Sequence, residues 1–184
     1  MCENVTILNF SSRKNGNCAN ISAFIRQFHQ DAQVNVFMID ENFKTCGGCD
    51  YECLQLGAEC PNVIPLQKQI MESVMRSDVA YLIAPNFCGF PSATFLAFNE
   101  RSIGYFNMDR AIMGKYMSVK KRFIMVSNTE TAAFDQAMRQ QTKEDPDVLY
   151  LKTARYGKRS TAGDILDSND AKADLQAFLE SYSF

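Results

Sequence analysis

The chain has 184 residues, of which 46% are hydrophobic and 22% are charged, with 9 glycines and 5 prolines. This composition is typical of a globular domain and excludes fibrous, collagen-like and wholly disordered proteins. With a formal net charge of −2, the chain lacks the basic excess with which sequence-independent nucleic-acid binders displace counterions from phosphates. We therefore expect no nucleic-acid partner.

No apolar run approaches the roughly 18 residues of a membrane span, and the N-terminus Met1-Cys2-Glu3-Asn4 lacks the basic and apolar regions of a secretory signal. These features predict a cytoplasmic protein with no membrane partner. In a reducing compartment, closely spaced cysteines are more often metal ligands or redox groups than disulfides. The odd total of seven cysteines also fits poorly with complete internal pairing.

Strand-like and helical patterns alternate along the first half of the chain. An apolar run at 5–10 predicts a strand, and the next apolar residues recur at the i, i+3, i+4, i+7 spacing of an amphipathic helix, namely Ile21, Phe24, Ile25 and Phe28. A second strand is predicted over 34–39, before a cysteine-rich segment. A helix over 66–74 and a strand over 79–84, which is expected to end at Pro85, complete this half.

The second half repeats the alternation. Residues 92–115 are predicted to be mainly helical, 123–127 a strand, 133–138 a helix and 148–151 a short strand. Ser168 or Asn169 can cap a last helix. The buried face of that helix is expected to consist of Ala171, Leu175, Phe178 and Leu179.

This alternation predicts a parallel sheet with helices on both faces, which is a three-layer α/β/α sandwich. Neither a linker nor a repeat divides the sequence, so we expect one domain over 1–184 with a cysteine-rich insertion at about 45–61. In such a sheet, ligands bind at the carboxyl ends of the strands, where the strand order reverses. The loops after the first, third and fourth strands are therefore the candidate site.

The loop after the first strand runs directly into a helix and reads Ser11-Ser12-Arg13-Lys14-Asn15-Gly16-Asn17-Cys18. A helix N-terminus offers unpaired N–H groups and a partial positive charge, and here hydroxyls and a guanidinium stand beside it. The loop matches neither the P-loop nor the G-x-G-x-x-G pattern, so a monophosphate ester is the expected ligand. Alternatively, Asn17 only caps the helix while Arg13 and Lys14 are solvated.

Together with the preceding Phe10, this loop resembles the signature G-S-x-R-x-x-G-N-[ST] of the NADPH-dependent FMN reductase and flavodoxin-like family. The resemblance extends from Ile7 to about Ile165 and implies a flavodoxin-like fold with a five-stranded parallel sheet in the order 2-1-3-4-5. It implies that Ser11, Arg13 and Asn17 bind the FMN phosphate, and Asn15, Gly16 and Cys18 are further expected contacts of the cofactor. In this chain, Phe10 replaces the usual glycine and Cys18 replaces the usual hydroxyl residue.

The loop after the third strand can surround a flavin ring, which needs apolar walls and nearby polar groups for its pyrimidine edge. Its candidate contacts are Pro85, Asn86, Phe87, Cys88, Gly89 and Phe90. The alternative is a helix start that buries Phe87 and Phe90 in the core. The loop and the helix that continues to Arg101 resemble a family segment that commonly lies at the dimer interface. The resemblance thus implies a homodimer or a dimer of dimers.

Two later segments add weaker signals for the same site. The polar tip after the fourth strand, Ser127-Asn128-Thr129, stands where the family usually carries small residues close to the flavin. Residues 156–165 resemble a late Gly-Asp-Ile segment of many family members. A solvent-exposed basic loop is the alternative for 156–165.

The cysteine-rich segment carries Cys46, Cys49, Cys53 and Cys60 in the spacing C-x₂-C-x₃-C-x₆-C, with Gly47, Gly48 and Gly57 between them. Four thiolates can hold a [4Fe–4S] cluster or a tetrahedral zinc ion. The spacing resembles the C-x₂-C-x₂-C-x₅-C motif of iron–sulfur flavoproteins, with one extra residue in each of the last two gaps. Metal-free thiols are the third possibility.

The resemblance predicts an FMN-dependent oxidoreductase that takes electrons from NAD(P)H and passes them to a small molecule or a redox partner protein. The flavin would carry the chemistry, so no side chain is predicted to be catalytic, and a bound cluster would relay single electrons. One alternative is a flavodoxin-type electron carrier without enzymatic activity. Another is a zinc-binding interaction protein that has lost its flavin.

Overall fold

The computed structural model describes residues 4–47, 49–55, 60–62, 64–108, 110–129 and 131–182. In this part of the chain, five parallel strands form a sheet in the order β2-β1-β3-β5-β6, and a short strand, β4, pairs antiparallel with β3. The strands are β1 (Asn4–Asn9), β2 (Gln33–Met38), β3 (Val79–Phe87), β4 (Phe90–Pro91), β5 (Lys120–Ser127) and β6 (Asp147–Lys152). Counted along the parallel strands, this is the predicted order 2-1-3-4-5.

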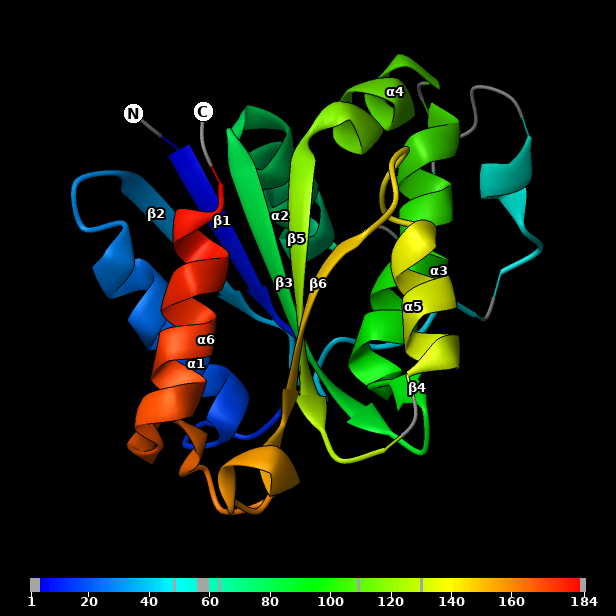
Figure 1. Cartoon of the computed structure of the whole chain (residues 1–184). Coiled ribbons are helices and arrows are strands. Elements are labelled where there is room, and N and C mark those ends of the chain that lie inside the picture. Colours follow the sequence, from blue (N-terminus) through cyan, green and yellow to red (C-terminus); the bar gives the residue numbers. More distant parts are fainter. Residues whose placement is uncertain are drawn as a thin grey trace.

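Helices cover both faces of the sheet (Figure 1). One face packs against α1 (Asn17–Phe28) and α6 (Asn169–Glu180), and the other against α2 (Pro65–Arg76), α3 (Ala93–Met108), α4 (Arg110–Ser118) and α5 (Ala132–Arg139). Short 3₁₀ turns lie at η1 (Glu52–Leu54), η2 (Thr153–Tyr156) and η3 (Ile165–Asp167). The predicted three-layer α/β/α sandwich is thereby confirmed. Of the helices in the described ranges, none has the length and apolar character needed to cross a membrane.

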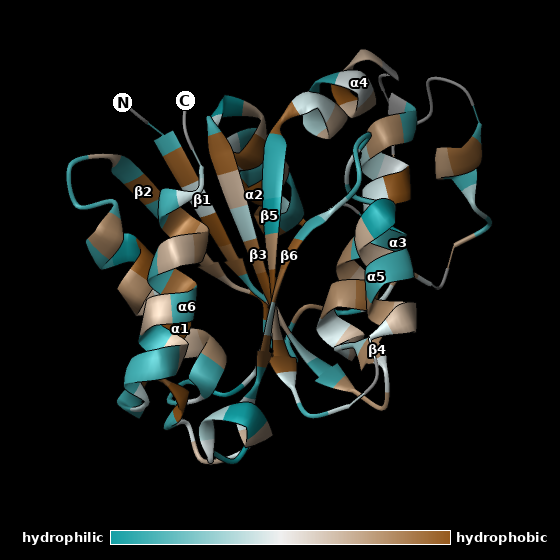
Figure 2. Cartoon of the chain, in the orientation of Figure 1, coloured by the Kyte–Doolittle hydropathy of each residue, from teal (hydrophilic) through white to brown (hydrophobic). Residues whose placement is uncertain are grey.

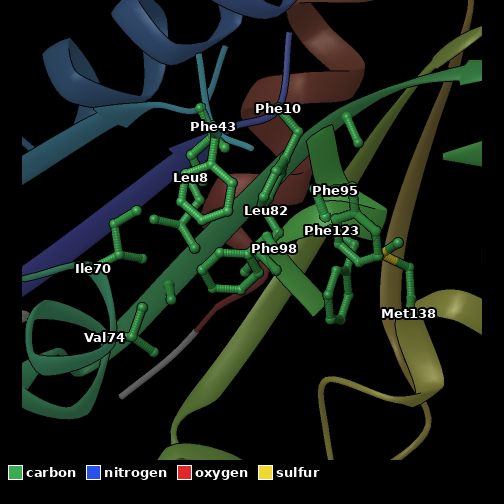
Figure 3. Close-up of a cluster of buried hydrophobic side chains, with 14 of the residues drawn as sticks. Leu8, Phe10, Phe43, Ile70, Val74, Leu82, Phe95, Phe98, Phe123 and Met138 are labelled. Atoms are coloured by element: carbon green, nitrogen blue, oxygen red, sulfur yellow. The ribbon is translucent and has the colours of Figure 1, made fainter. Parts of the chain in front are cut away.

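The central strands are buried on both faces, as expected for a parallel sheet between two helical layers, and they are largely apolar in Figure 2. In the core under α2, α3 and α5, Phe10 packs its ring against Phe95 and Phe98, with ring centroids 4.9 and 5.5 Å apart (Figure 3). Phe10 therefore fixes the end of β1 in the core immediately before the β1–α1 loop begins.

Strand β3 does not end at Pro85, which corrects the prediction. Pro85 stays in register with Val126 of β5, and the strand continues to Phe87 before it turns back into β4. On its other side, β3 is paired with β1 only as far as Ile83, whose carbonyl accepts the N–H of Phe10. The carbonyl of Phe10, which follows β1, accepts the hydroxyls of Ser92 and Thr94 at 2.7 and 2.9 Å, so this acceptor does not depend on the N–H that proline lacks.

Strand β5 also begins earlier than predicted, at Lys120 instead of Phe123. Arg122 is buried and forms an ion pair with Asp147, with 2.6 Å between Nε and Oδ2. Lys121 is also buried and donates to the backbone carbonyls of Tyr116 and Val119. Asp147 on the neighbouring strand and two nearby backbone carbonyls thus provide polar partners for Arg122 and Lys121 on this buried strand. At the other end of the chain, Ser168 caps α6 by accepting the N–H of Ala171, as the sequence predicted.

Candidate functional site

A cavity of about 600 Å³ opens at the carboxyl edge of the sheet, between the loops that follow β1, β3, β5 and β6. Twelve of the fifteen predicted flavin contacts line it: Ser11, Arg13, Gly16, Asn17, Cys18, Pro85, Asn86, Phe87, Cys88, Ser127, Asn128 and Thr129. The other three, Asn15, Gly89 and Phe90, lie outside the lining. Sequence positions more than a hundred residues apart therefore meet at the edge where parallel sheets bind ligands.

The β1–α1 loop brings the N-terminus of α1 to the cavity. Gly16 is the residue before the helix, and its carbonyl accepts the N–H groups of Ala19 and Asn20 at 3.0 and 3.1 Å. A Cβ at Gly16 would lie 3.1 Å from Cβ of Arg13, so glycine lets the loop fold tightly here. The Ser11 hydroxyl accepts the N–H of Arg13 at 3.3 Å. Helix N–H groups, a hydroxyl and a guanidinium are thus gathered on one side of the cavity.

The segment 160–165 after β6 lies across this loop. The Asn17 amide donates to the Ser160 carbonyl at 3.2 Å, and its oxygen accepts the N–H of Ile165 at 3.0 Å. Arg13 donates to the Thr161 carbonyl. Asn17 thus uses its side chain to hold 160–165 against α1 in this structure. The hydroxyl residues Ser160 and Thr161 join the lining of the cavity, although the sequence did not single them out.

Gly163 marks the closest approach of the two segments. Its φ is +77°, and a Cβ there would stand 2.6 Å from the carbonyl oxygen of Asn15. The Asn20 amide donates to the Gly163 carbonyl at 2.7 Å. The resemblance to a late Gly-Asp-Ile segment pointed to this region, and the structure shows that its glycine allows two backbones to pack together.

The opposite wall of the cavity joins the ends of β3 and β5. Asn86 donates to the Thr129 hydroxyl at 3.1 Å, and the same hydroxyl accepts the N–H of Gly89 at 3.3 Å. Asn128 in turn accepts hydrogen bonds from the Thr153 hydroxyl and the N–H of Ala154, at 2.9 and 2.6 Å. These contacts hold the loops after β3, β5 and β6 in a fixed relation around the cavity.

The turn between β3 and β4 excludes the alternative that this loop starts a helix and buries two aromatic residues. Phe87 and Phe90 pair across the hairpin and are 64% and 58% exposed. Cys88 and Gly89 both have positive φ, at 51° and 92°, the backbone that two-residue hairpin turns of type I′ require. The two phenylalanines therefore project from the rim of the cavity, where Phe87 contributes to the lining.

Cys18 lies in the cavity wall but is chemically passive. Burial raises the pKa of its thiol to about 12, although the Ser11 hydroxyl and the Arg13 charge act in the opposite direction. The thiolate is the nucleophilic form of cysteine, so Cys18 stays a neutral thiol near pH 7.

The cysteine-rich segment is fastened to α3, away from the cavity lining. Arg101 donates to the carbonyls of Thr45 and Asn62, both at 2.8 Å, and Glu100 accepts the N–H of Cys46 at 2.9 Å. A second cavity of about 160 Å³ lies between this segment and α3 and is lined by three of the four cysteines together with apolar side chains. The lining cysteines are Cys46, Cys53 and Cys60.

The four thiols lie near one another without forming a metal centre. Burial raises the pKa of Cys53, and the neighbouring thiols of Cys60, Cys46 and Cys49 raise it further. Among the residues that the structure describes, no group of three or more His, Cys, Asp or Glu side chains is arranged to hold a metal ion. The predicted motif includes Gly48 and Gly57, which lie outside the described residues.

The sequence matches no family model and no curated protein. Solved structures share the fold at low identity. The Trp repressor binding protein from Bacillus subtilis is 15% identical, with 98% of this chain and 99% of that chain covered and a TM-score of 0.62. The NAD(P)H:(acceptor) oxidoreductase FerB from Paracoccus denitrificans is 8% identical, with coverage of 97% and 96% and a TM-score of 0.54.

An oxidoreductase from Corynebacterium diphtheriae is 10% identical, with 98% of each chain covered and a TM-score of 0.51. At these identities the similarity concerns the fold alone, and in each comparison it extends over nearly the whole length of both chains. The chain therefore has the α/β flavodoxin-like fold.

Proposed function

We propose that the chain is an FMN-dependent oxidoreductase that takes electrons from NAD(P)H and passes them to a small acceptor or a redox partner protein. The cavity at the carboxyl edge of the sheet carries this proposal, because a helix N-terminus borders one part of it and a wall of amides and apolar side chains borders another. An anionic tail and a flat, partly polar ring need those two environments. The names of similar structures, which include an NAD(P)H:(acceptor) oxidoreductase, point the same way.

The residues at the phosphate side fit a phosphate monoester. The Ser11 hydroxyl, the Arg13 guanidinium and the first N–H groups of α1 would bind it, with Ser160 and Thr161 on the facing segment. Each of these groups donates hydrogen bonds, and two of them add positive charge, as an anion requires. Asn17 would contribute as a positioning residue, since its amide already joins α1 to 160–165.

The residues at the ring side would orient the flavin and keep water from its face. Pro85 and Phe87 supply apolar surface, while Asn86, Ser127 and Thr129 form a hydrogen-bonded wall. Bound FMN supplies the hydride chemistry itself, and the protein contributes binding, orientation and electrostatics. The four cysteines do not fit a metal centre as they lie, so the proposed reaction uses the flavin alone.

The direct test is to titrate the protein with FMN and then add NADPH or NADH without oxygen. We expect FMN binding, followed by loss of the oxidised flavin's visible absorbance faster than for free FMN. Arg13→Ala should weaken FMN binding by about tenfold or more, because a charge-assisted contact contributes about 1.5–3 kcal/mol. Lys14→Ala is the matched control, since Lys14 is not among the residues that line the cavity and lies in the adjoining groove along α1 and β2. Bound FMN that NAD(P)H does not reduce would instead indicate an electron carrier, and failure to bind FMN would refute both.

We also propose that the chain forms a homodimer through α3 and the adjoining hairpin. Leu96 and Ile103 lie seven residues apart on α3, hence on the same side of the helix, and are 46% and 51% exposed. Phe87 and Phe90 are also exposed, in the hairpin that leads directly into α3. A self-associating patch of this kind suits the isologous contact of a two-fold dimer.

Leu96→Glu is expected to shift the protein from dimer to monomer in sedimentation velocity, since it places a charge in the centre of the apolar contact. Phe28→Glu is the matched control, because Phe28 is a 39% exposed aromatic residue on α1, on the opposite face of the sheet. A wild-type protein that sediments as a monomer at high concentration would contradict the dimer. Equal effects of the two variants would contradict its placement on α3.

A further inference from the structure

The cysteine-rich segment is held on α3 by contacts that the flavin site does not use. Arg101 binds carbonyls on both sides of the four cysteines, at Thr45 and at Asn62. Six residues further along α3, Asn107 donates to the carbonyl of Cys53 at 2.8 Å. Cys53 is thus positioned through its own backbone carbonyl. The segment that carries Cys60 is held at Asn62, two residues after Cys60.

Gly104 lies between these contacts and brings two of the cysteines to one point. A Cβ at Gly104 would stand 3.3 Å from Cβ and 3.4 Å from Sγ of Cys60, and 3.5 Å from Cβ of Cys53. Glycine inside a helix costs roughly 1 kcal/mol relative to alanine. Here its missing Cβ leaves the space in which both cysteine side chains rest against α3.

We propose that Cys53 and Cys60 form a reversible disulfide, so that this segment is a dithiol–disulfide centre built on α3. A disulfide needs only two thiols with β-carbons about 4 Å apart, and the β-carbons of Cys53 and Cys60 both lie within 3.5 Å of the same point beside Gly104, so the two side chains share one small space. A tetrahedral metal would need four thiols around one centre. The described cysteines bring no third side chain into such an arrangement.

The oxidant in this step is a low-molecular-weight disulfide such as oxidised glutathione. Cys60 is the more accessible of the two, whereas Cys53 is buried, so the Cys60 thiolate attacks first and forms a mixed disulfide while one small thiol leaves. The Cys53 thiolate then attacks the Cys60 sulfur, and the second small thiol leaves. The two cysteines lose two electrons and two protons, and the small disulfide gains both.

The test equilibrates the full-length protein with defined mixtures of reduced and oxidised glutathione, alkylates the remaining thiols and locates disulfides by peptide mass spectrometry. We expect one peptide pair joined through Cys53 and Cys60, absent from both Cys53→Ser and Cys60→Ser. Gly104→Ala should lower the equilibrium constant for this disulfide several-fold, because the new methyl group occupies the space beside the Cys60 sulfur and the β-carbons of both cysteines. Gly114→Ala in α4 is the matched control, since a Cβ there meets nothing within 4 Å.

Three outcomes would overturn the proposal. One is stoichiometric zinc or iron that co-purifies with the chain and protects all four cysteines from alkylation. Another is glutathione attached to Cys60 without a Cys53–Cys60 bond at any redox poise, and the third is a disulfide between other cysteines. The measurement needs no flavin, so its result is independent of whether the chain binds FMN.

Discussion

Gly163→Ala is expected to weaken FMN binding by about tenfold or more, which corresponds to about 1.4 kcal/mol or more. The added Cβ would stand 2.6 Å from the carbonyl oxygen of Asn15, which belongs to the backbone and has no side-chain torsion with which to move away. Segment 160–165 must therefore shift from the β1–α1 loop. That shift strains two hydrogen bonds, one from the Asn20 amide to the Gly163 carbonyl and one from the Asn17 amide to the Ser160 carbonyl. Both hydrogen bonds hold segment 160–165 at the phosphate side of the cavity.

Gly157→Ala is the control that separates this contact from backbone strain. Gly157 also has positive φ, at +65°, but a Cβ there meets nothing within 4 Å. Both variants place alanine in the left-handed region, at a cost of about 1–2 kcal/mol in stability, and only Gly163→Ala forces two segments apart. FMN titration followed by fluorescence, with thermal unfolding in parallel, distinguishes them. Equal FMN affinities in the two variants would mean that segment 160–165 does not shape the phosphate site.

The sequence predicts the sheet well because the determining signals are local. The central strands are continuous apolar runs, and the helices between them repeat their apolar residues at helical spacing, as in Ile21 and Ile25. Both patterns report directly on burial. The position of the candidate site follows from the same signals, since the ends of parallel strands share one edge of the sheet.

What the sequence did not predict depends on contacts between distant residues. Asn17 was expected at the phosphate because it matches the asparagine of the family signature, and its hydrogen bonds to Ser160 and Ile165 bridge more than 140 positions. Only the folded chain shows which of its neighbours that amide contacts. The Pro85 error has a similar cause, because proline interrupts a strand only where a neighbouring strand needs its N–H.

The early start of β5 is the clearest case. Lys121 and Arg122 precede the apolar run and resemble a solvated turn in the sequence, yet both are buried. Arg122 is compatible with the interior because Asp147 of β6 and two residues at the end of α6 surround its guanidinium. Its Nη2 donates to the Ser181 hydroxyl at 2.8 Å, and its Cζ lies 3.7 Å from the centroid of the Phe178 ring.

These contacts make Arg122→Ala the substitution with the largest expected effect on stability, a loss of about 3 kcal/mol or more in the free energy of unfolding. Removing one member of a buried ion pair costs about 3–5 kcal/mol. Since the Asp147 side chain is 36% exposed, water can solvate its carboxylate after the arginine is removed. The expected loss of stability therefore lies near the lower end of that range. The lost packing under Phe178 adds to it, because α6 docks on the sheet through this residue.

Arg139→Ala is the matched control, because Arg139 pairs with Asp145 where both side chains are more than half exposed. Exposed pairs of this kind contribute about 0–1 kcal/mol, so its urea unfolding curve should nearly match that of the wild type. A loss below about 1 kcal/mol for Arg122→Ala would mean that water replaces the guanidinium as the hydrogen-bond partner of Asp147 and Ser181. It would also mean that α6 docks on the sheet by apolar contacts alone. A large loss with FMN affinity retained in the folded protein would show that stability is concentrated at the amino edge of the sheet, while the candidate site at the carboxyl edge depends on its own loop contacts.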